Sequence, residues 1–298
     1  DDKRIIPDGK NEAPNGTILS GDFNNDDIIR GSGKTIEIKN NTENAYHVVT
    51  GINKNSIFLF LDGFTIKRGN ANQNSEIKIN GQGVHRDRGA GIYFRSSDSS
   101  AILNLNNVDV SCNTTTTNGG GVYNESSNNS SSEVNIKQSQ ISNNIGRFGA
   151  GIHSYSYDLE SKINIYNSTI KSNNSSDNGG GIYSYGNNSL QSISNVNIYN
   201  SILSKNYAPN GGGIYSSSQS NKSFVKIVNS SVVDNSSNLI ISSQNLFTFY
   251  NSIFYKNKDI NDKLITTVSS LYNNYNSEIK YSYIQGITST DNGNIDGT

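Results

Sequence analysis

The sequence predicts an all-β protein: a right-handed parallel β-helix, or solenoid, with about 30 residues in each coil and with asparagine ladders. Three observations predict this fold. A glycine box recurs at a nearly constant period, a segment of alternating apolar residues follows each box, and asparagines occupy fixed columns when these segments are aligned. Only 32% of the residues are hydrophobic, which suits thin stacked layers better than one large core.

Five glycine boxes begin at Gly89, Gly119, Gly149, Gly179 and Gly211. A period of this size is typical of solenoids, propellers and other arrays. Propeller blades would need tight hairpins, and the segments carry no such signal. A phosphate-binding loop would need a helix after the glycines, whereas a strand pattern follows them. Because glycine tolerates positive φ and close backbone approach, each box is predicted to be a corner of a coil.

The segment after each box alternates apolar and polar residues, which indicates a strand with one face buried. Its first apolar column is Leu103, Val134, Ile163, Val196, Val225 and Phe247. Two polar columns follow, the first being Asn107, Gln138, Asn167, Asn200, Asn229 and Asn251, and the second Asn113, Asn144, Asn173, Asn206, Asn235 and Asn257. A buried amide needs partners, and stacked amides both donate and accept. We therefore expect both columns to form ladders at the corners of the coils.

We interpret residues 1–298 as a single parallel β-helix domain. Residues 1–45 are expected to be an irregular N-terminal section, 70–88 a long loop excursion, 89–257 regular coils and 258–298 closing coils. The last coils lose glycine and gain apolar residues. An open end of a β-helix invites aggregation, so we expect a further C-terminal domain or anchor to follow.

Charge and composition argue against several classes of protein. The formal net charge is −1, with 24 basic and 25 acidic residues scattered along the chain, so we expect no nucleic-acid partner. No apolar run is long enough for a transmembrane segment. The single cysteine, Cys112, excludes an internal disulfide.

The repeated segments resemble the repeats of polymorphic outer membrane proteins, whose marks are a GG-apolar box and an F-x-x-N box. Phe254–Asn257, "FYKN", matches the second box literally, while earlier coils replace the phenylalanine by Val, Ile or Leu. A wider resemblance, to secreted β-helix proteins of Bacteroidetes and related bacteria, rests on "TILSGDFN" (17–24), "YHVV" (46–49), "LDGFTI" (61–66) and "NSIF" (251–254). The resemblance implies a secreted or bacterial cell-surface protein of adhesin type and supplies no agreed catalytic residues.

Aromatic residues form columns that strand alternation predicts to face outward. We predict the ligand-binding residues to be Tyr93, Tyr123, His153, Tyr155, Tyr183, Tyr185 and Tyr215. Stacked tyrosines make an amphipathic strip suited to sugar rings or to a cell-surface protein. The alternative is cross-strand stacking that only stabilises the sheet.

A catalytic site is the second hypothesis, because polysaccharide lyases and glycoside hydrolases share this fold. The candidate residues are His85, Arg86, Arg88 and Arg95, near the end of the excursion. A hydrolase needs convergent carboxylates, and the acidic residues of the repeats share no column. A solvated polar loop explains the same residues, so we assign no catalytic residue.

Calcium is the one cofactor considered. Asp22, Asn24 and Asp26 alternate in "GDFNNDD" and offer oxygen ligands, but an Asx-rich turn explains the same residues. The sequence therefore favours a non-enzymatic extracellular module that binds a glycan or a protein. The alternatives are a polysaccharide lyase or hydrolase acting in a groove, and a passive stalk or spacer.

Overall fold

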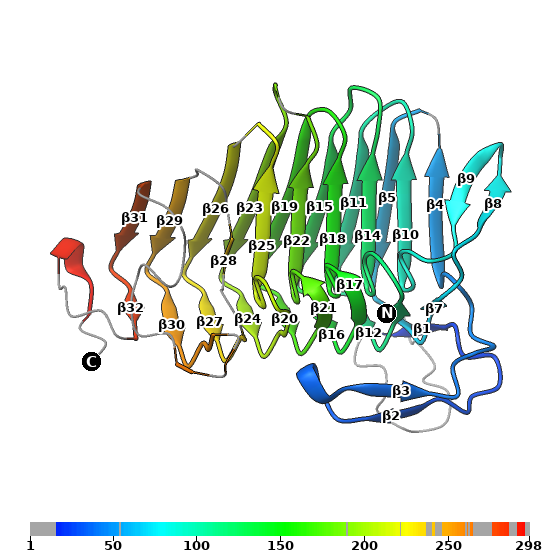
Figure 1. The fold of residues 1–298 in the computed structure, drawn as a ribbon, viewed down its shortest axis with the longest axis horizontal. Helices are drawn as coiled ribbons and strands as arrows, with labels where there is room; N and C mark the ends of the chain where they lie inside the picture. The colour runs from blue at the N-terminus through cyan, green and yellow to red at the C-terminus, as the bar shows by residue number, and fades with distance from the viewer. Residues whose placement is uncertain are drawn as a thin grey trace, which may run out of the picture.

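The protein folds as an all-β parallel solenoid of about six turns with about 30 residues in each turn (Figure 1). The computed structural model describes residues 16–53, 55–188, 190–220, 222–236, 240–241, 246–259, 261, 263–264, 276–285 and 291–295. The predicted fold class is confirmed. The right-handed sense of the coils stays a prediction.

Among the described residues, equivalent strands of successive coils pair in parallel and form three long sheets. The glycine-box sheet contains β4 (Val49–Asn53), β10 (Ile92–Ser96), β14 (Val122–Ser126), β18 (Ile152–Ser156), β22 (Ile182–Gly186), β25 (Ile214–Ser218) and β28 (Ile240–Ile241). The long-strand sheet contains β5 (Ile57–Asp62), β11 (Ala101–Asn106), β15 (Ser132–Lys137), β19 (Glu160–Tyr166), β23 (Ile193–Tyr199), β26 (Lys222–Val228), β29 (Leu246–Tyr250) and β31 (Asn276–Lys280).

The third long sheet, the short-strand sheet, closes each coil. It contains β1 (Thr17–Ser20), β6 (Phe64–Lys67), β12 (Asp109–Ser111), β16 (Gln140–Ser142), β20 (Thr169–Lys171), β24 (Ile202–Ser204), β27 (Ser231–Val233), β30 (Ile253–Tyr255) and β32 (Tyr283–Ile284). A small fourth sheet contains β7 (Asn70–Ala71), β13 (Thr114–Thr115), β17 (Ile145–Phe148) and β21 (Asn174–Asn178). Short 3-10 helices η2 (Gly33–Thr35) and η4 (Asp291–Gly293) lie outside these sheets.

The core is a column of apolar side chains inside the coils. The residue after each glycine box pairs in register with its equivalent in the next coil, as Ile152 does with Val122 and Ile182, and these side chains are fully buried. In the short-strand sheet, Ile66 pairs in register with Val110, and both side chains are fully buried. The predicted alternation of inward apolar and outward polar residues is therefore confirmed.

The second asparagine column is a buried ladder, as predicted. Each side-chain amide donates to the Oδ1 of the asparagine one coil further on, at 3.0–3.2 Å, in an unbroken series from Asn113 to Asn257. Each Oδ1 also accepts the backbone N–H of the preceding ladder asparagine. These bonds satisfy backbone groups at a corner where regular strand pairing is interrupted.

The prediction that the first asparagine column is a buried ladder is wrong. Its members after Asn107 are exposed, and all have φ between +47° and +53°. Each marks the corner between the long-strand and short-strand sheets, where the chain needs the left-handed conformation. Asparagine tolerates that conformation better than other non-glycine residues, which explains the column. Asn251 donates its side-chain amide to Asn229 Oδ1 at 2.8 Å, but this contact is exposed.

Serine forms further ladders that the sequence analysis did not predict. The serines just after these left-handed residues are buried, and the backbone N–H of each donates to the hydroxyl of the serine one coil on, at 3.0–3.2 Å. The ladder consists of Ser139, Ser168, Ser201, Ser230, Ser252 and Ser282. A second series of buried serine hydroxyls zigzags through the core between the glycine-box and long-strand sheets, from Ser132 to Ser223.

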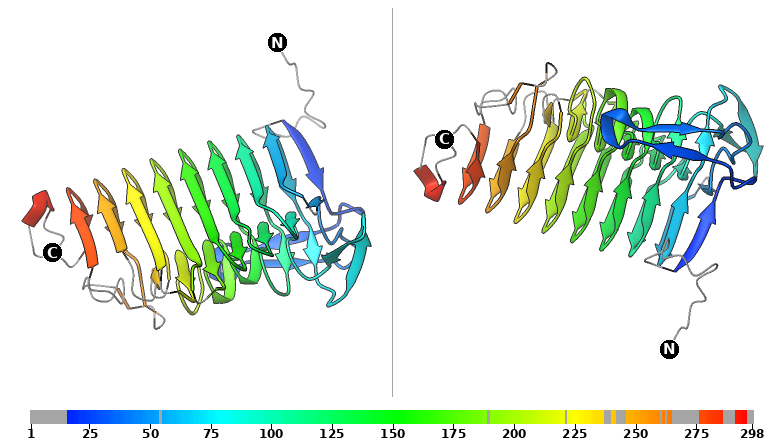
Figure 2. Two further views of the ribbon diagram at one scale, coloured as in Figure 1. Left: turned by 90° about the horizontal axis from the view of Figure 1, so that it is seen from above. Right: turned by 90° about the horizontal axis from the view of Figure 1, so that it is seen from below.

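Two segments expected to be irregular carry ordered strands. Residues 70–88 begin with β7 and contain an antiparallel hairpin, β8 (Glu76–Ile79) and β9 (Gln82–His85), which we call the covering hairpin. In the N-terminal section, β1 pairs with β6 as a rung of the solenoid. Next, β2 (Ile28–Arg30) and β3 (Glu37–Lys39) form a hairpin that lies along the outside of the coils (Figure 2).

The closing coils begin with β31 and β32, which pair with β29 and β30 as predicted. In the part of the chain that the structure describes, none of the helices has the length and apolar character needed to cross a membrane. The expected domain boundaries at residue 1 and at residue 298 lie outside the described residues.

Candidate functional site

The aromatic residues after the glycine boxes form one continuous stack along the solenoid. Its ring centroids are 5.2 Å apart for Tyr93–Tyr123, 5.3 Å for Tyr123–His153, 4.9 Å for His153–Tyr183 and 5.1 Å for Tyr183–Tyr215. In-register pairing of β10, β14, β18, β22 and β25 places each ring above the next. The predicted stack therefore exists, and it stabilises the sheet through cross-strand ring contacts.

The first three members of the stack are covered, contrary to the expectation that the whole column lies on the surface. Tyr93 and Tyr123 are 0% exposed and His153 is 2% exposed. Val84 of the covering hairpin forms a small second core with the two tyrosines, and Ile77 packs against it. Tyr93 and Tyr123 point away from the main core, as alternation predicts, and the covering hairpin buries these two rings.

The surface beyond His153 is a partly exposed group that we call the tyrosine strip: Tyr155, Tyr157, Tyr183, Tyr185 and Tyr215. Tyr155 stacks on Tyr185 at 5.7 Å, which gives a second column beside the first. Stacked rings turn their faces toward neighbouring coils, since the planes of Tyr183 and Tyr215 differ by only 6°. The strip therefore presents mainly ring edges and phenol hydroxyls to the solvent.

Tyr157 breaks this pattern. Its ring makes an angle of 79° with the ring of Tyr155, and the residue is 42% exposed. Among the described residues no other ring stacks on it, so it offers apolar ring surface as well as a hydroxyl. The strip thus combines hydrogen-bonding edges with one accessible ring.

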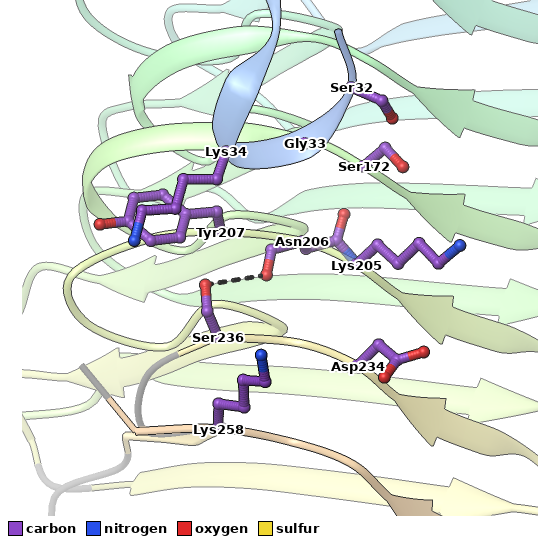
Figure 3. Close-up of a pocket in the computed structure, with 10 residues that line it drawn as sticks. All are labelled: Ser32, Gly33, Lys34, Ser172, Lys205, Asn206, Tyr207, Asp234, Ser236 and Lys258. Atoms are coloured by element: carbon purple, nitrogen blue, oxygen red, sulfur yellow. Dashed lines mark hydrogen bonds between the residues drawn. The ribbon is translucent and has the colours of Figure 1, made fainter. Parts of the chain in front are cut away.

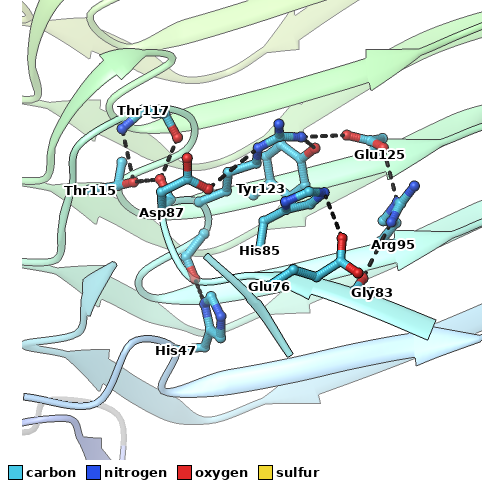
Figure 4. Close-up of polar contacts among 12 residues, drawn as sticks. His47, Glu76, Gly83, His85, Asp87, Arg95, Thr115, Thr117, Tyr123 and Glu125 are labelled. Atoms are coloured by element: carbon cyan, nitrogen blue, oxygen red, sulfur yellow. Dashed lines mark hydrogen bonds and ion pairs between the residues drawn. The ribbon is translucent and has the colours of Figure 1, made fainter. Parts of the chain in front are cut away.

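The second outward column begins with an ion-pair cluster at Glu125. The Glu125 side chain is 4% exposed, Arg95 Nε lies 3.0 Å from its Oε1, and Arg88 Nη1 lies 3.5 Å from its Oε2 (Figure 4). Arg88 also donates to the Tyr123 hydroxyl at 3.0 Å and lies 3.7 Å from Asp87. Burial raises the pKa of Glu125, and the two arginines oppose that shift.

The candidate catalytic patch is divided by the structure. Arg88 and Arg95 meet at Glu125, whereas His85 Nε2 lies 3.7 Å from Glu76 in the covering hairpin. Arg86 lies over the ring of Tyr46, 5.0 Å from its centroid. The four residues predicted as one patch therefore do not converge on a common point.

Two threonines of the next coil hold the segment that carries Arg88 in place. The hydroxyls of Thr115 and Thr117 both donate to the backbone carbonyl of Asp87, just before Arg88 (Figure 4). These threonines belong to the next coil, so the end of the excursion is tied to the regular solenoid. Arg88 is consequently held at the edge of the tyrosine strip.

A hollow of about 230 Å³, which we call the His153 hollow, lies where the covered and exposed parts of the stack meet. Its lining residues are Arg88, Asn118, Glu125, Phe148, His153, Tyr155, Tyr157 and Tyr183. Neither ring nitrogen of His153 has a partner with hydrogen-bond geometry among the described residues, although the backbone of Phe148 is close enough to favour the charged form slightly. Burial, together with the charge of Arg88, lowers the pKa of His153 to about 3, so the imidazole is neutral.

The tyrosines of this site remain protonated at neutral pH. Burial raises the pKa of Tyr93 to about 12 and also raises the pKa of Tyr155, Tyr183 and Tyr215. A general base works best when its pKa lies near the working pH. Tyrosines with raised pKa values, and a histidine with a pKa of about 3, are suited to hydrogen bonding rather than to proton transfer.

A second hollow, of about 330 Å³, lies under the turn between β2 and β3 (Figure 3). Lys34 from η2 enters it beside the ring of Tyr207, at 4.9 Å from the ring centroid. Lys205 and Lys258 come from coils on either side of the coil that carries Asp234. Asp234 is the one carboxylate in the lining among the described residues. The sequence gives no signal for this hollow, because the hairpin that covers it lies far from Lys205 and Lys258 in the chain.

The predicted calcium ligands lie in a turn closed by Asp22. Its carboxylate accepts the backbone N–H groups of Asp26 at 3.2 Å and Asp27 at 3.4 Å, and Arg68 Nη1 lies 2.9 Å from Oδ2. Carboxylate oxygens of Asp22, Asp26 and Glu43 lie within 4.8 Å of one another, and Asn24 is exposed. The two backbone N–H groups that donate to Asp22 explain this turn without an ion, Arg68 already balances one charge, and calcium binding stays a prediction.

Comparisons of the chain with protein-family models, with curated proteins and with solved structures gave no match. The fold is thus described by its geometry, as a β-solenoid of about six parallel turns.

Proposed function

We propose that this chain is a non-enzymatic, extracellular, adhesin-like module that binds a glycan through the tyrosine strip. The observation that carries the proposal is the row of half-buried tyrosines beside the His153 hollow. Within the described part of the chain, no hydrogen bond satisfies the hydroxyl of Tyr155 or of Tyr183. A sugar offers hydroxyls that both donate and accept, together with C–H groups that pack on rings, so it complements such a surface.

Binding is favoured over catalysis by the protonation states. The tyrosines stay protonated, His153 stays neutral, and Glu125 is held between two arginines. A lyase or hydrolase would need a group that exchanges a proton near the working pH. The resemblance of the repeats to polymorphic outer membrane proteins supports a location outside the cell, on a bacterial surface or in the medium.

The experiment is incubation of the purified chain with immobilised and soluble polysaccharides, neutral and acidic, with and without Ca²⁺. We expect retention on at least one polysaccharide and no release of products, including unsaturated uronates detected by ultraviolet absorbance. The Tyr183→Ala/Tyr185→Ala variant should lose at least tenfold in affinity. Tyr166→Ala is the matched control, because Tyr166 stacks on Tyr199 on the long-strand sheet, away from the strip.

Three results would contradict the proposal. Cleavage of a polysaccharide that is lost in Arg86→Ala/Arg88→Ala would support the lyase or hydrolase instead. Equal losses in the strip variant and in Tyr166→Ala would mean that binding does not involve the strip. Retention on none of the polysaccharides would leave a protein ligand or a passive spacer.

A further inference from the structure

We propose that the His153 hollow binds one uncharged sugar residue, with the imidazole of His153 as its buried hydrogen-bonding partner. This inference rests on the proposed glycan binding and assigns a subsite within it. The proposed subsite specifies where one sugar unit of the glycan binds, that His153 is its partner, and that this unit carries no charge.

His153 is the polar group that lacks partners in this place. Its side chain is almost fully buried, and among the described residues neither ring nitrogen has a partner with hydrogen-bond geometry. A buried polar group without a hydrogen bond is destabilising by about 1–3 kcal/mol relative to a paired one. A neutral imidazole has one N–H donor and one lone pair, which point in different directions, so a sugar hydroxyl that enters the hollow pairs with one of the two nitrogens.

The hollow exists because the stack holds a histidine at this rung. The neighbouring rungs carry Tyr123 and Tyr183, whose in-register strands flank β18 on both sides. A phenol ring and its hydroxyl extend further from the backbone than an imidazole does, so the shorter side chain leaves space at its outer end. Phe148, Tyr155 and Tyr157 wall that space with aromatic groups.

The charges around the hollow predict a neutral ligand. Arg88 and Arg95 face the carboxylates of Glu125 and Asp87, so two positive charges oppose two negative ones. A uronate would add a carboxylate beside Glu125, and the described lining of the hollow offers no unpaired cation to balance it. Sugar hydroxyls, in contrast, bind to Arg88 and to tyrosine hydroxyls without a change in net charge.

The size of the hollow limits the ligand to a small unit. Its volume of about 230 Å³ compares with the ~30 Å³ that a water molecule occupies in the liquid. The space therefore suits a single pyranose ring rather than several linked residues. The remainder of a glycan chain would extend along the tyrosine strip toward Tyr185.

Histidine NMR provides the test, because the chain contains only three histidines. The ¹⁵N resonances of His153 are assigned by their loss in His153→Tyr, a change that restores the tyrosine of the adjacent rungs. Methyl β-glucoside, methyl β-galactoside and methyl α-mannoside are titrated separately, with methyl β-glucuronide as the charged analogue. We expect at least one neutral glycoside to shift the His153 resonances saturably and the glucuronide to bind at least tenfold more weakly.

Two results would overturn the inference: no shift of His153 with any of the three neutral glycosides, or glucuronide binding as tight as that of glucoside. Polysaccharide retention measured on the same samples separates this failure from that of the proposed function. Retention that depends on Tyr183 and Tyr185 but is unchanged in His153→Tyr would keep the strip and refute the subsite. A His153 shift without retention on any polysaccharide would keep the subsite and refute the strip.

Discussion

Removal of one rung from the buried asparagine ladder should destabilise the solenoid strongly. In the change Asn173→Ala, the lost amide donates to Asn206 Oδ1 at 3.0 Å and to the Ile141 carbonyl at 3.1 Å. The lost carbonyl accepts both the backbone N–H and the side-chain amide of Asn144, at 3.1 and 3.0 Å. Asn173 is fully buried, so water does not replace these partners without a rearrangement.

The magnitude follows from the groups that are left unpaired. The Asn144 backbone N–H loses its acceptor, and one hydrogen of the Asn144 amide loses its own, while the other still reaches the Val110 carbonyl. Each of these two buried donors without an acceptor is destabilising by about 1–3 kcal/mol, so the expected loss in free energy of unfolding is about 2–6 kcal/mol. Because each coil of a solenoid contacts only its neighbours, the destabilisation should be concentrated in the coils next to Asn173.

The assay is urea unfolding followed by far-ultraviolet circular dichroism, with amide hydrogen exchange at Asn144 as the local probe. The matched control is Asn167→Gly, which removes an exposed asparagine of the same coil at φ +49°, a conformation that glycine adopts freely. The control should lie within about 0.5 kcal/mol of the unmodified protein. If Asn173→Ala proved no more harmful than the control, or if Asn144 kept its protection, the ladder argument would be refuted.

Three further changes test other parts of the account. Gly151→Ala places a Cβ 2.4 Å from the Gly181 carbonyl oxygen and should prevent folding or lower the Tm steeply. The control Gly81→Ala has φ +74° but open space around the new Cβ, so it should lower the free energy of unfolding by only about 1–2 kcal/mol. Equal Tm values for the two variants would contradict this prediction. The pKa of His153 is about 3 in the folded chain and about 6.5 in the unfolded chain, so protons bind preferentially to the unfolded state. This residue should therefore lower the free energy of unfolding by up to about 1.4 kcal/mol for each pH unit below pH 6.5. His153→Tyr should flatten that slope in urea titrations between pH 7 and 4.5, and an unchanged slope would speak against it. Glu125→Gln leaves two partly buried arginines without their carboxylate and should destabilise by about 3 kcal/mol in the same assay, whereas a neutral effect would mean that the pair contributes nothing.

The architecture of the coils could be predicted because the repeat period and the alternation of apolar residues can be read directly from the sequence. The pairing of Ile152 with Val122 and Ile182 follows directly from the aligned segments. The two asparagine columns could not be told apart in this way, since an amide serves equally in a buried ladder and at a left-handed corner. Asn173 and Asn167 differ in backbone conformation and burial, which the letters alone do not show.

The candidate site was predicted less completely because its cover comes from outside the repeat. The alternation of residues correctly predicts that Tyr93 and Tyr123 point away from the main core, but the covering hairpin buries them. A signal for that hairpin was present: Asn80 and Gly81 stand between alternating apolar residues, and both adopt positive φ as a tight hairpin turn requires. His153 is stacked between Tyr123 and Tyr183, and Phe148 lines the hollow beside it, so its burial also depends on residues outside its own segment.

The most direct test of glycan binding by the tyrosine strip is carbene footprinting, read by mass spectrometry, with and without the most strongly retained polysaccharide. We predict that labelling falls at Tyr155 on β18, at Tyr157 just after β18 and at Tyr185 on β22, and stays unchanged at Tyr166 and Tyr199 on the long-strand sheet. Protection of the long-strand sheet, or of the lysines beneath the β2–β3 turn, with the strip still labelled, would contradict it.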